Sequence, residues 1–219
     1  MHGASVHMVP MDPARGWQLD LASIPTDVLK RARVLIANYP NNPTGAVTTH
    51  ADLAELVAFC RRHNLLLMHD LAYSELTFDG HVAPSVFEVP GARDVAIEFH
   101  SCSKSFNMAG MRVGFVVGRA DALDALLSYR SNVGYGVSMP IQHAAAFALD
   151  NVRTLMPPIV AEYQRRRDAL YDALQQGGWD VVAPQAAMYA WLPLPDGMEA
   201  WDAVDRVLME GQVMITPGL

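Results

Sequence analysis

The sequence has 219 residues, of which 51% are hydrophobic and 18% carry charged side chains. A chain of this length and apolar content can bury a sizeable core, which excludes a disordered protein. The formal net charge of -7 argues against nucleic acid or an anionic membrane surface as the main partner. No apolar stretch reaches the roughly 20 residues of a membrane-spanning helix, so we expect a soluble protein.

Cys60 and Cys102 are the only cysteines of the sequence. Two cysteines do not make a disulfide framework, so we expect a protein of the reducing cytoplasm. The eight histidines are scattered along the chain, and no pair has convincing metal-ligand spacing. The sequence therefore predicts no metal site.

Short apolar runs alternate with amphipathic segments over residues 1–177, a pattern typical of an α/β domain with a mostly parallel sheet flanked by helices. Thr49 is available as the N-cap of one helix, and Gly177 is placed to end another. In chain order we expect a strand at Ser5–Pro10, a strand at Ala32–Asn38, a helix at His50–His63, strands at Leu65–Asp70, Val95–His100 and Arg112–Val117, and helices at Ala120–Ser131, Pro140–Asn151 and Ile159–Gln176.

The pattern changes after the glycine pair at the end of the last of these helices. There we expect strands at Trp179–Ala183 and Met188–Leu194, a helix at Glu199–Glu210 and a strand at Gln212–Thr216. The sequence therefore predicts two domains. Residues 1–177 would form part of a large domain, and residues 178–219 would begin a smaller α+β domain.

Polar clusters follow three of the predicted strands, at the end where ligands gather in open α/β sheets. The first cluster, residues 38–45, reads Asn-Tyr-Pro-Asn-Asn-Pro-Thr-Gly. Its Asn42 offers an amide that can both donate and accept hydrogen bonds. Taken alone, the cluster is equally typical of a tight turn between a strand and a helix.

The second cluster, residues 69–73, places Asp70 at a strand end. A carboxylate there can cap a helix, bind a metal or pair with a cationic ring nitrogen. Alternation along the strand puts His69 and Asp70 on opposite faces, which disfavours a metal site. Tyr73, taken alone, is more often a packed aromatic than a catalytic one.

The third cluster, residues 101–112, contains a lysine between two apolar strands. Lys104 is a candidate nucleophile in this position. The hydroxyls of Ser101 and Ser103, together with the guanidinium of Arg112, suit a phosphate group. Taken alone, a lysine in such a loop more often has its ammonium group in water.

Together the three clusters resemble the class I/II aminotransferases of the fold-type-I pyridoxal-phosphate enzymes. The resemblance rests on Asn-Asn-Pro-Thr-Gly, Asp-x-x-Tyr and Ser-x-Ser-Lys in this order, with an arginine eight residues after the lysine, and it extends from Gly3 to Gly218. Ile97–His100, running into Ser-x-Ser-Lys and followed by Asn107-Met108, is similar to the LL-diaminopimelate and alanine-type branch.

The resemblance implies transfer of an amino group between an amino acid and a 2-oxo acid, by a homodimer with pyridoxal 5'-phosphate as cofactor. The large domain would bind the cofactor. Lys104 would form the internal aldimine and then move the proton that transamination requires. Asp70 would pair with the pyridine nitrogen and keep it protonated.

The remaining site residues would hold the other ends of the cofactor. Tyr73 and Asn42 would hydrogen-bond the phenolic oxygen of the ring, and Ser101, Ser103 and Arg112 would hold the phosphate. The resemblance also implies a cis peptide bond between Asn42 and Pro43.

Two other functions remain open. A pyridoxal-phosphate β-lyase on the same fold would use the same lysine, aspartate and arginine. A non-catalytic regulator would only sense pyridoxal phosphate or an amine.

Parts of the family's site would lie outside these residues. The phosphate-binding loop, the aromatic stacked on the ring and the tyrosine lent by the partner subunit would precede Met1, and the arginine for the substrate carboxylate would follow Leu219. The resemblance therefore implies a fragment, for which we expect weak cofactor binding and no transamination.

Overall fold

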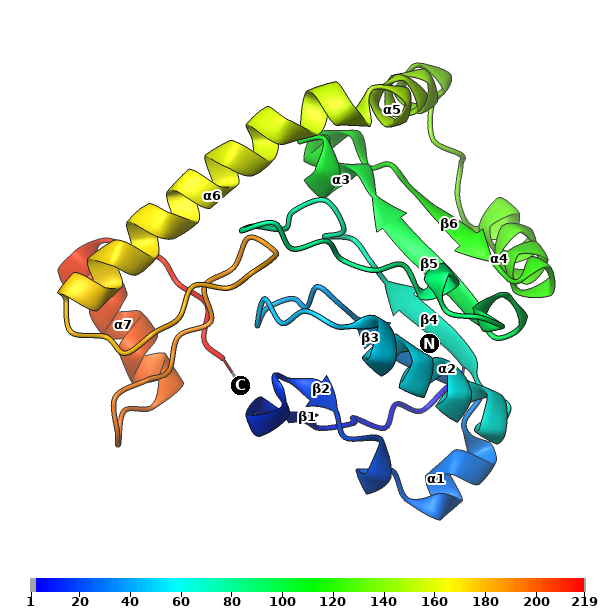
Figure 1. Cartoon of the computed structure of the whole chain (residues 1–219), viewed down its shortest axis with the longest axis horizontal. Helices are drawn as coiled ribbons and strands as arrows, with labels where there is room; N and C mark the ends of the chain where they lie inside the picture. Colours follow the sequence, from blue (N-terminus) through cyan, green and yellow to red (C-terminus); the bar gives the residue numbers. More distant parts are fainter. Residues whose placement is uncertain (1–2, 219) are drawn as a thin grey trace.

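A computed structural model describes residues 3–218, and Met1, His2 and Leu219 lie outside the described part. Figure 1 shows a twisted sheet with helices on its sides and a long helix, α6, that leads to the C-terminal segment. The sheet consists of β3 (Val34–Asn38), β4 (Leu66–Asp70), β5 (Ala96–Ser101) and β6 (Gly114–Gly118), in this spatial order. β3, β4 and β5 are parallel, whereas β6 is antiparallel to β5. The predicted mostly parallel sheet is confirmed.

The predicted helices are confirmed, with ends that shift by a few residues in most cases. They are α2 (His50–His63), α4 (Ala120–Val133), α5 (Met139–Asp150), α6 (Val152–Gln176) and α7 (Ala200–Gly211). The structure adds two short helices that the sequence did not predict, α1 (Thr26–Arg31) and α3 (Cys102–Ser105). Short 3-10 turns lie at Pro13–Arg15, Leu21–Ser23, Val86–Glu88, Ala92–Asp94 and Ala109–Met111. None of the helices in residues 3–218 is both long and apolar enough to cross a membrane.

The start of α6 differs most from the prediction, at Val152 instead of Ile159. Prolines inside a helix remove hydrogen-bond donors and usually mark a helix start, so the prediction began after Pro157 and Pro158. The structure continues the helix through both prolines. Two donors lost near the beginning leave most of the backbone hydrogen bonds of this 25-residue helix in place.

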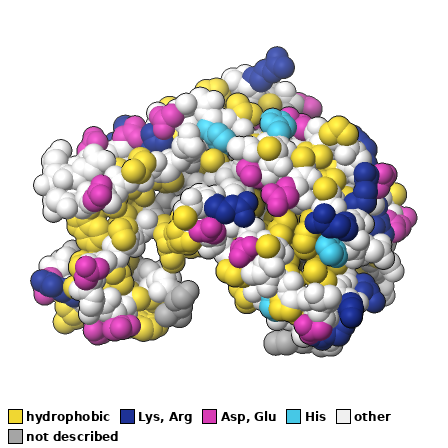
Figure 2. Space-filling view, turned by 60° about the horizontal axis from the view of Figure 1, so that its bottom comes forward, with side chains coloured by type: hydrophobic (Ala, Val, Ile, Leu, Met, Phe, Trp, Pro, Cys, Tyr) yellow, Lys and Arg dark blue, Asp and Glu magenta, His cyan; other side chains and the backbone are white. Residues whose placement is uncertain are grey.

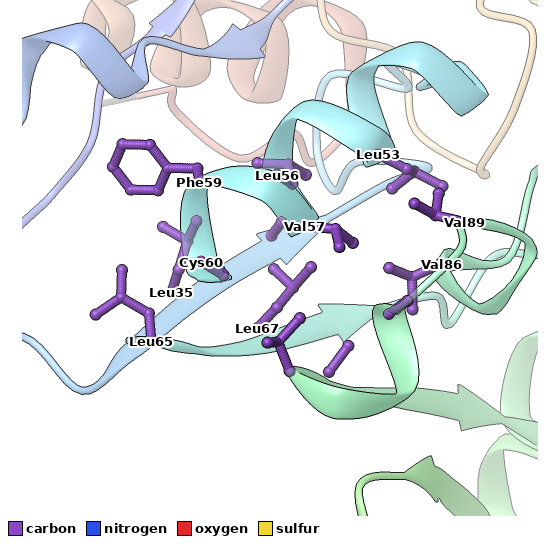
Figure 3. Close-up of a cluster of buried hydrophobic side chains, with 14 of the residues drawn as sticks. Leu35, Leu53, Leu56, Val57, Phe59, Cys60, Leu65, Leu67, Val86 and Val89 are labelled. Atoms are coloured by element: carbon purple, nitrogen blue, oxygen red, sulfur yellow. The ribbon is translucent and has the colours of Figure 1, made fainter. Parts of the chain in front are cut away.

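Helix α2 covers one face of β3 and β4 and forms the main core with them. It begins at a capping box, in which Thr49 and Asp52 satisfy each other's backbone N–H groups, and it ends at Asn64 in the left-handed conformation. Its apolar side packs onto the inward residues of the strands, with Val86 and Val89 closing the end of the cluster (Figure 3). On the other face of the sheet Ile36 is 65% exposed.

The predicted strand at Ser5–Pro10 is wrong. A two-stranded hairpin forms a few residues later, from β1 (Met11–Asp12) and β2 (Gln18–Leu19). The alternating apolar residues Val6 and Met8 are more than 80% exposed. Alternation alone therefore does not make a strand here, because residues 5–10 have no hydrogen-bonded strand partner among residues 3–218.

The three strands predicted in the C-terminal segment are also wrong. Residues 179–183, 188–194 and 212–216 have irregular backbone, and among residues 3–218 the segment forms a single isolated bridge, between Thr77 and Ala186. An extended stretch becomes a strand only beside a hydrogen-bonded neighbour.

The surface of the molecule has a hollow. Figure 2 shows it between the α7 side, on the left, and the side that carries the sheet.

Candidate active site

The three polar clusters meet at one edge of the sheet. Asn38, Asp70 and Ser101 are the last residues of β3, β4 and β5. Because these strands are parallel and in register, their carboxyl ends lie side by side. The candidate residues that follow them in sequence therefore gather in one place, as ligand-binding residues do in open α/β sheets.

Asn38 ties the first cluster to the second, a role that sequence reasoning did not give it. Its Nδ2 donates to the backbone oxygen of Asp70 over 3.0 Å. Its Oδ1 accepts from the backbone N–H of Asn42 over 2.8 Å. The loop that carries Asn42 is thereby held against the end of β4.

The loop of residues 38–45 is fixed from within by a second asparagine. The buried Asn41 accepts hydrogen bonds from the backbone N–H and the hydroxyl of Thr44, over 3.2 and 2.8 Å. The Asn42–Pro43 bond is cis, as the resemblance implied, and the Tyr39–Pro40 bond is cis as well. Asn42 itself is exposed at the site edge.

Gly45 ends this loop where another part of the chain approaches closely. Its φ of +70° lies in the left-handed region. A Cβ at this position would lie 2.6 Å from Cβ of Pro184 and 3.1 Å from the backbone oxygen of Ala186. Glycine at position 45 therefore permits both the left-handed backbone conformation and the close approach of Pro184 and Ala186.

Replacing Gly45 with alanine is expected to lower the free energy of unfolding by about 1–3 kcal/mol for the steric overlap, in addition to the backbone strain. Gly80→Ala is the matched control, since Gly80 has a φ of +76° and no heavy atom lies within 4 Å of where its added methyl group would be. That variant is expected to lose only about 1 kcal/mol from backbone strain. Urea unfolding measures both. Equal losses of unfolding free energy in the two variants would show that steric overlap with Pro184 adds nothing to the cost of Gly45→Ala.

Tyr73 is the last residue of the second cluster and is 4% exposed. Its hydroxyl lies 2.8 Å from the hydroxyl of Tyr189. Burial raises the pKa of the Tyr73 phenol well above its usual value, the hydrogen bond with Tyr189 raises it further, and a hydrogen bond with the Asn42 side chain opposes both. Tyr73 is therefore a neutral phenol at physiological pH.

Lys104 lies in α3, directly after β5, and is half-buried. Its Nζ lies 5.9 Å from the centre of the Tyr73 ring. Ser101 caps α3 by accepting from the backbone N–H of Ser103 over 3.3 Å, which leaves its own hydroxyl proton to donate elsewhere. Asp70 uses Oδ1 to accept from Ala72 N–H over 3.2 Å.

Arg112 is the candidate residue that the structure joins least to the others. It is exposed, and its guanidinium donates to the backbone oxygen of Ala109 over 3.0 Å. Within residues 3–218 it makes no hydrogen bond to Ser101 or Ser103. Nor does this part of the chain hold a group of three or more His, Cys, Asp or Glu side chains arranged for a metal ion.

His69 points away from Asp70, as the alternation predicted, into a buried polar network behind the site. The carboxylate of Glu98, 1% exposed, lies 3.0 Å from nitrogens of both His69 and His100. It also accepts from the hydroxyl of Ser85 and from Val86 N–H, over 2.8 and 2.7 Å. Burial alone would raise the pKa of Glu98, but the hydrogen bonds from His100, His69 and Val86 outweigh it and hold the pKa at about 2.

Comparison with known proteins places this arrangement in a family. The chain belongs to the class I and II aminotransferases, whose family model matches residues 1–219. This confirms the family that the three clusters predicted, and enzymes of this family use pyridoxal phosphate.

Two curated relatives that resemble the chain are LL-diaminopimelate aminotransferases. It is 42% identical over 217 residues to LL-diaminopimelate aminotransferase 2 of Trichormus variabilis, an alignment that covers 99% of this chain and 56% of the relative. It is 44% identical over 216 residues to LL-diaminopimelate aminotransferase of Desulforudis audaxviator, with 99% and 55% covered. The chain therefore spans about half the length of these relatives.

Solved structures confirm the fold-type-I architecture. The apo structure of BacF from Bacillus subtilis matches with a TM-score of 0.92 and 33% identity, covering 98% of this chain and 55% of that one. A probable N-succinyldiaminopimelate aminotransferase of Thermus thermophilus matches with a TM-score of 0.83 and 31% identity, covering 94% and 55%.

Proposed function

We propose that the protein is an aminotransferase that moves an amino group between an amino acid and a 2-oxo acid. One observation carries the proposal: the Lys104 amine lies over the ring of Tyr73, at the sheet edge where Asp70 ends its strand. The family match supports the same activity.

The side chains at this edge fit pyridoxal phosphate. When bound, this cofactor supplies an electron-accepting pyridine ring. The protonated ring nitrogen of the cofactor needs a hydrogen-bond acceptor. Asp70 can supply one, because its Oδ2 has no hydrogen-bond partner in the described part of the chain. Donors suit its phenolic oxygen, and both Tyr73 and Asn42 carry one. The hydroxyls of Ser101 and Ser103 suit its phosphate.

Each residue would then act at a stated atom. Lys104 would attach the cofactor through Nζ and, once released, accept and return the proton of the reacting carbon. The carboxylate of Asp70 would keep the ring nitrogen protonated. The Tyr73 hydroxyl and the Asn42 amide would donate to the phenolic oxygen.

The phosphate would be held by donors from the third cluster. Ser101 and Ser103 would donate their hydroxyl protons, and the Arg112 guanidinium would turn from its present contact with Ala109 toward the phosphate.

The relatives' names support an LL-diaminopimelate-type amino acid as the substrate. A homodimer in the cytoplasm is part of the same proposal. The division into a cofactor-binding domain at residues 1–177 and a smaller domain from residue 178 stays a prediction.

Incubating the protein at its natural length with LL-diaminopimelate and a 2-oxo acid tests the proposed function. We expect the amino acid that corresponds to the added 2-oxo acid, and no product when that acid is omitted. A β-lyase would instead release pyruvate and ammonia from a suitable amino acid without any 2-oxo acid. Absence of turnover with a full panel of amino acids would favour the non-catalytic regulator.

A further inference from the structure

A short C-terminal stretch, residues 184–189, lies against the loop that follows Tyr73. Two backbone hydrogen bonds of 2.8 Å join them, one from Phe78 N–H to the oxygen of Gln185 and one from Ala187 N–H to the oxygen of Leu76. The stretch is therefore docked next to the active site by its backbone.

Arg167 of α6 also holds residues 184–189 against this loop. Its side chain is 9% exposed, and Nη1 donates to the backbone oxygen of Pro184 over 3.0 Å and to Asp79 over 2.6 Å. Its guanidinium also lies over the ring of Phe78, 4.8 Å from the centre. Residues 184–189 are thus positioned without any help from the hydroxyl of Tyr189.

That hydroxyl instead reaches into the site. It lies 2.8 Å from the Tyr73 hydroxyl, and the two rings meet edge to face with centroids 5.8 Å apart. Either hydroxyl can be the donor. A phenol has one hydroxyl proton. Tyr73 can therefore keep its hydrogen bond with Tyr189 and also donate to another acceptor only if Tyr189 is the donor between the two.

We propose that Tyr189 is a positioning residue of this site, whose hydroxyl donates to Tyr73 and so directs the Tyr73 proton toward the phenolic oxygen of the cofactor. The inference rests on the proposed function. It assigns the C-terminal segment a part in setting the cofactor's protonation, although Tyr189 lies 116 residues from Tyr73 in sequence.

The decisive measurement is the pH titration of the bound cofactor's visible absorption, in the protein at its natural length. Tyr189→Phe is expected to change the acid dissociation constant of the bound cofactor about threefold to tenfold, the contribution of one neutral hydrogen bond. The change should have the direction that Tyr73→Phe produces. In the Tyr73→Phe background, Tyr189→Phe should add nothing further, since it acts only through Tyr73.

Tyr163→Phe is the control, since Tyr163 packs against the same cluster as Tyr73 but is not bonded to its hydroxyl. This variant should titrate like the unmodified protein. An unchanged titration in Tyr189→Phe, or a full effect that persists without the Tyr73 hydroxyl, would overturn the inference while leaving the proposed function intact. A Tyr189→Phe protein that does not fold would also contradict it, since the backbone contacts would then be insufficient. If the protein showed no absorption from bound cofactor, both the proposed function and the proposed role of Tyr189 would be wrong.

Discussion

Replacing Lys104 with alanine is expected to abolish attachment of the cofactor and to lower turnover on the order of a thousandfold or more. The lysine would serve both as the covalent attachment point and as the proton carrier, and general acid–base groups alone contribute about 10²–10⁴-fold. Lys104 is half-buried beside Tyr73, whereas Lys30, the other lysine of the sequence, is exposed in α1.

Borohydride reduction of the cofactor-loaded protein, followed by peptide mapping, measures attachment directly. The label should lie on Lys104 and should disappear in Lys104→Ala. Lys30→Ala is the matched control and should keep both the label and the turnover. A label on Lys30, or one that survives in Lys104→Ala, would show that the lysine is wrongly assigned.

Replacing Glu98 with glutamine is expected to destabilise the protein by about 3 kcal/mol at pH 7. The buried carboxylate accepts from four groups, and its pKa of about 2 lies well below the usual value of 4.5. A difference of this size corresponds to about 3 kcal/mol of stabilisation. Glutamine keeps the shape but offers one acceptor oxygen, and its amide N–H groups would face the donors that Glu98 now satisfies.

The pH dependence follows from the direction of the shift. A carboxylate with a lowered pKa contributes its full stabilisation above the unfolded value of about 4.5, and loses it as pH falls from there through about 2. The difference in unfolding free energy between the original protein and Glu98→Gln should therefore shrink from about 3 kcal/mol at pH 7 to about 1 kcal/mol at pH 3. Urea unfolding at both pH values measures it, and taking the difference cancels the titrating groups that do not contact Glu98.

Glu88→Gln provides the comparison, because Glu88 also contacts a histidine and a backbone N–H but on the surface. Its side chain is 51% exposed, and its partner His50 lies 2.7 Å away. Exposed ion pairs contribute little, so this variant should change stability far less than Glu98→Gln. Equal effects at the two positions would mean that burial is not what makes Glu98 important.

Much of the sheet and its main covering helix could be predicted from the sequence. β3 and β4 are compact apolar runs, and α2 is bounded by a capping threonine at one end and an asparagine at the other. These signals are local, since a helix cap and a run of apolar side chains depend only on residues that are near one another in sequence. The same holds for the three polar clusters, whose residue types and order pointed to the family.

Other features depended on which segments the fold brings together. Residues 179–183 have a strand-like pattern but no strand partner among residues 3–218, and Gly45 is constrained by Pro184 far along the chain. The contact between Tyr73 and Tyr189 leaves no trace in either local sequence, because a tyrosine in a loop comes to lie beside the candidate site only when the tertiary structure places it there. Residue type and local pattern determined the family and the site's candidate chemistry, whereas contacts between distant segments decided which side chains lie beside the candidate site.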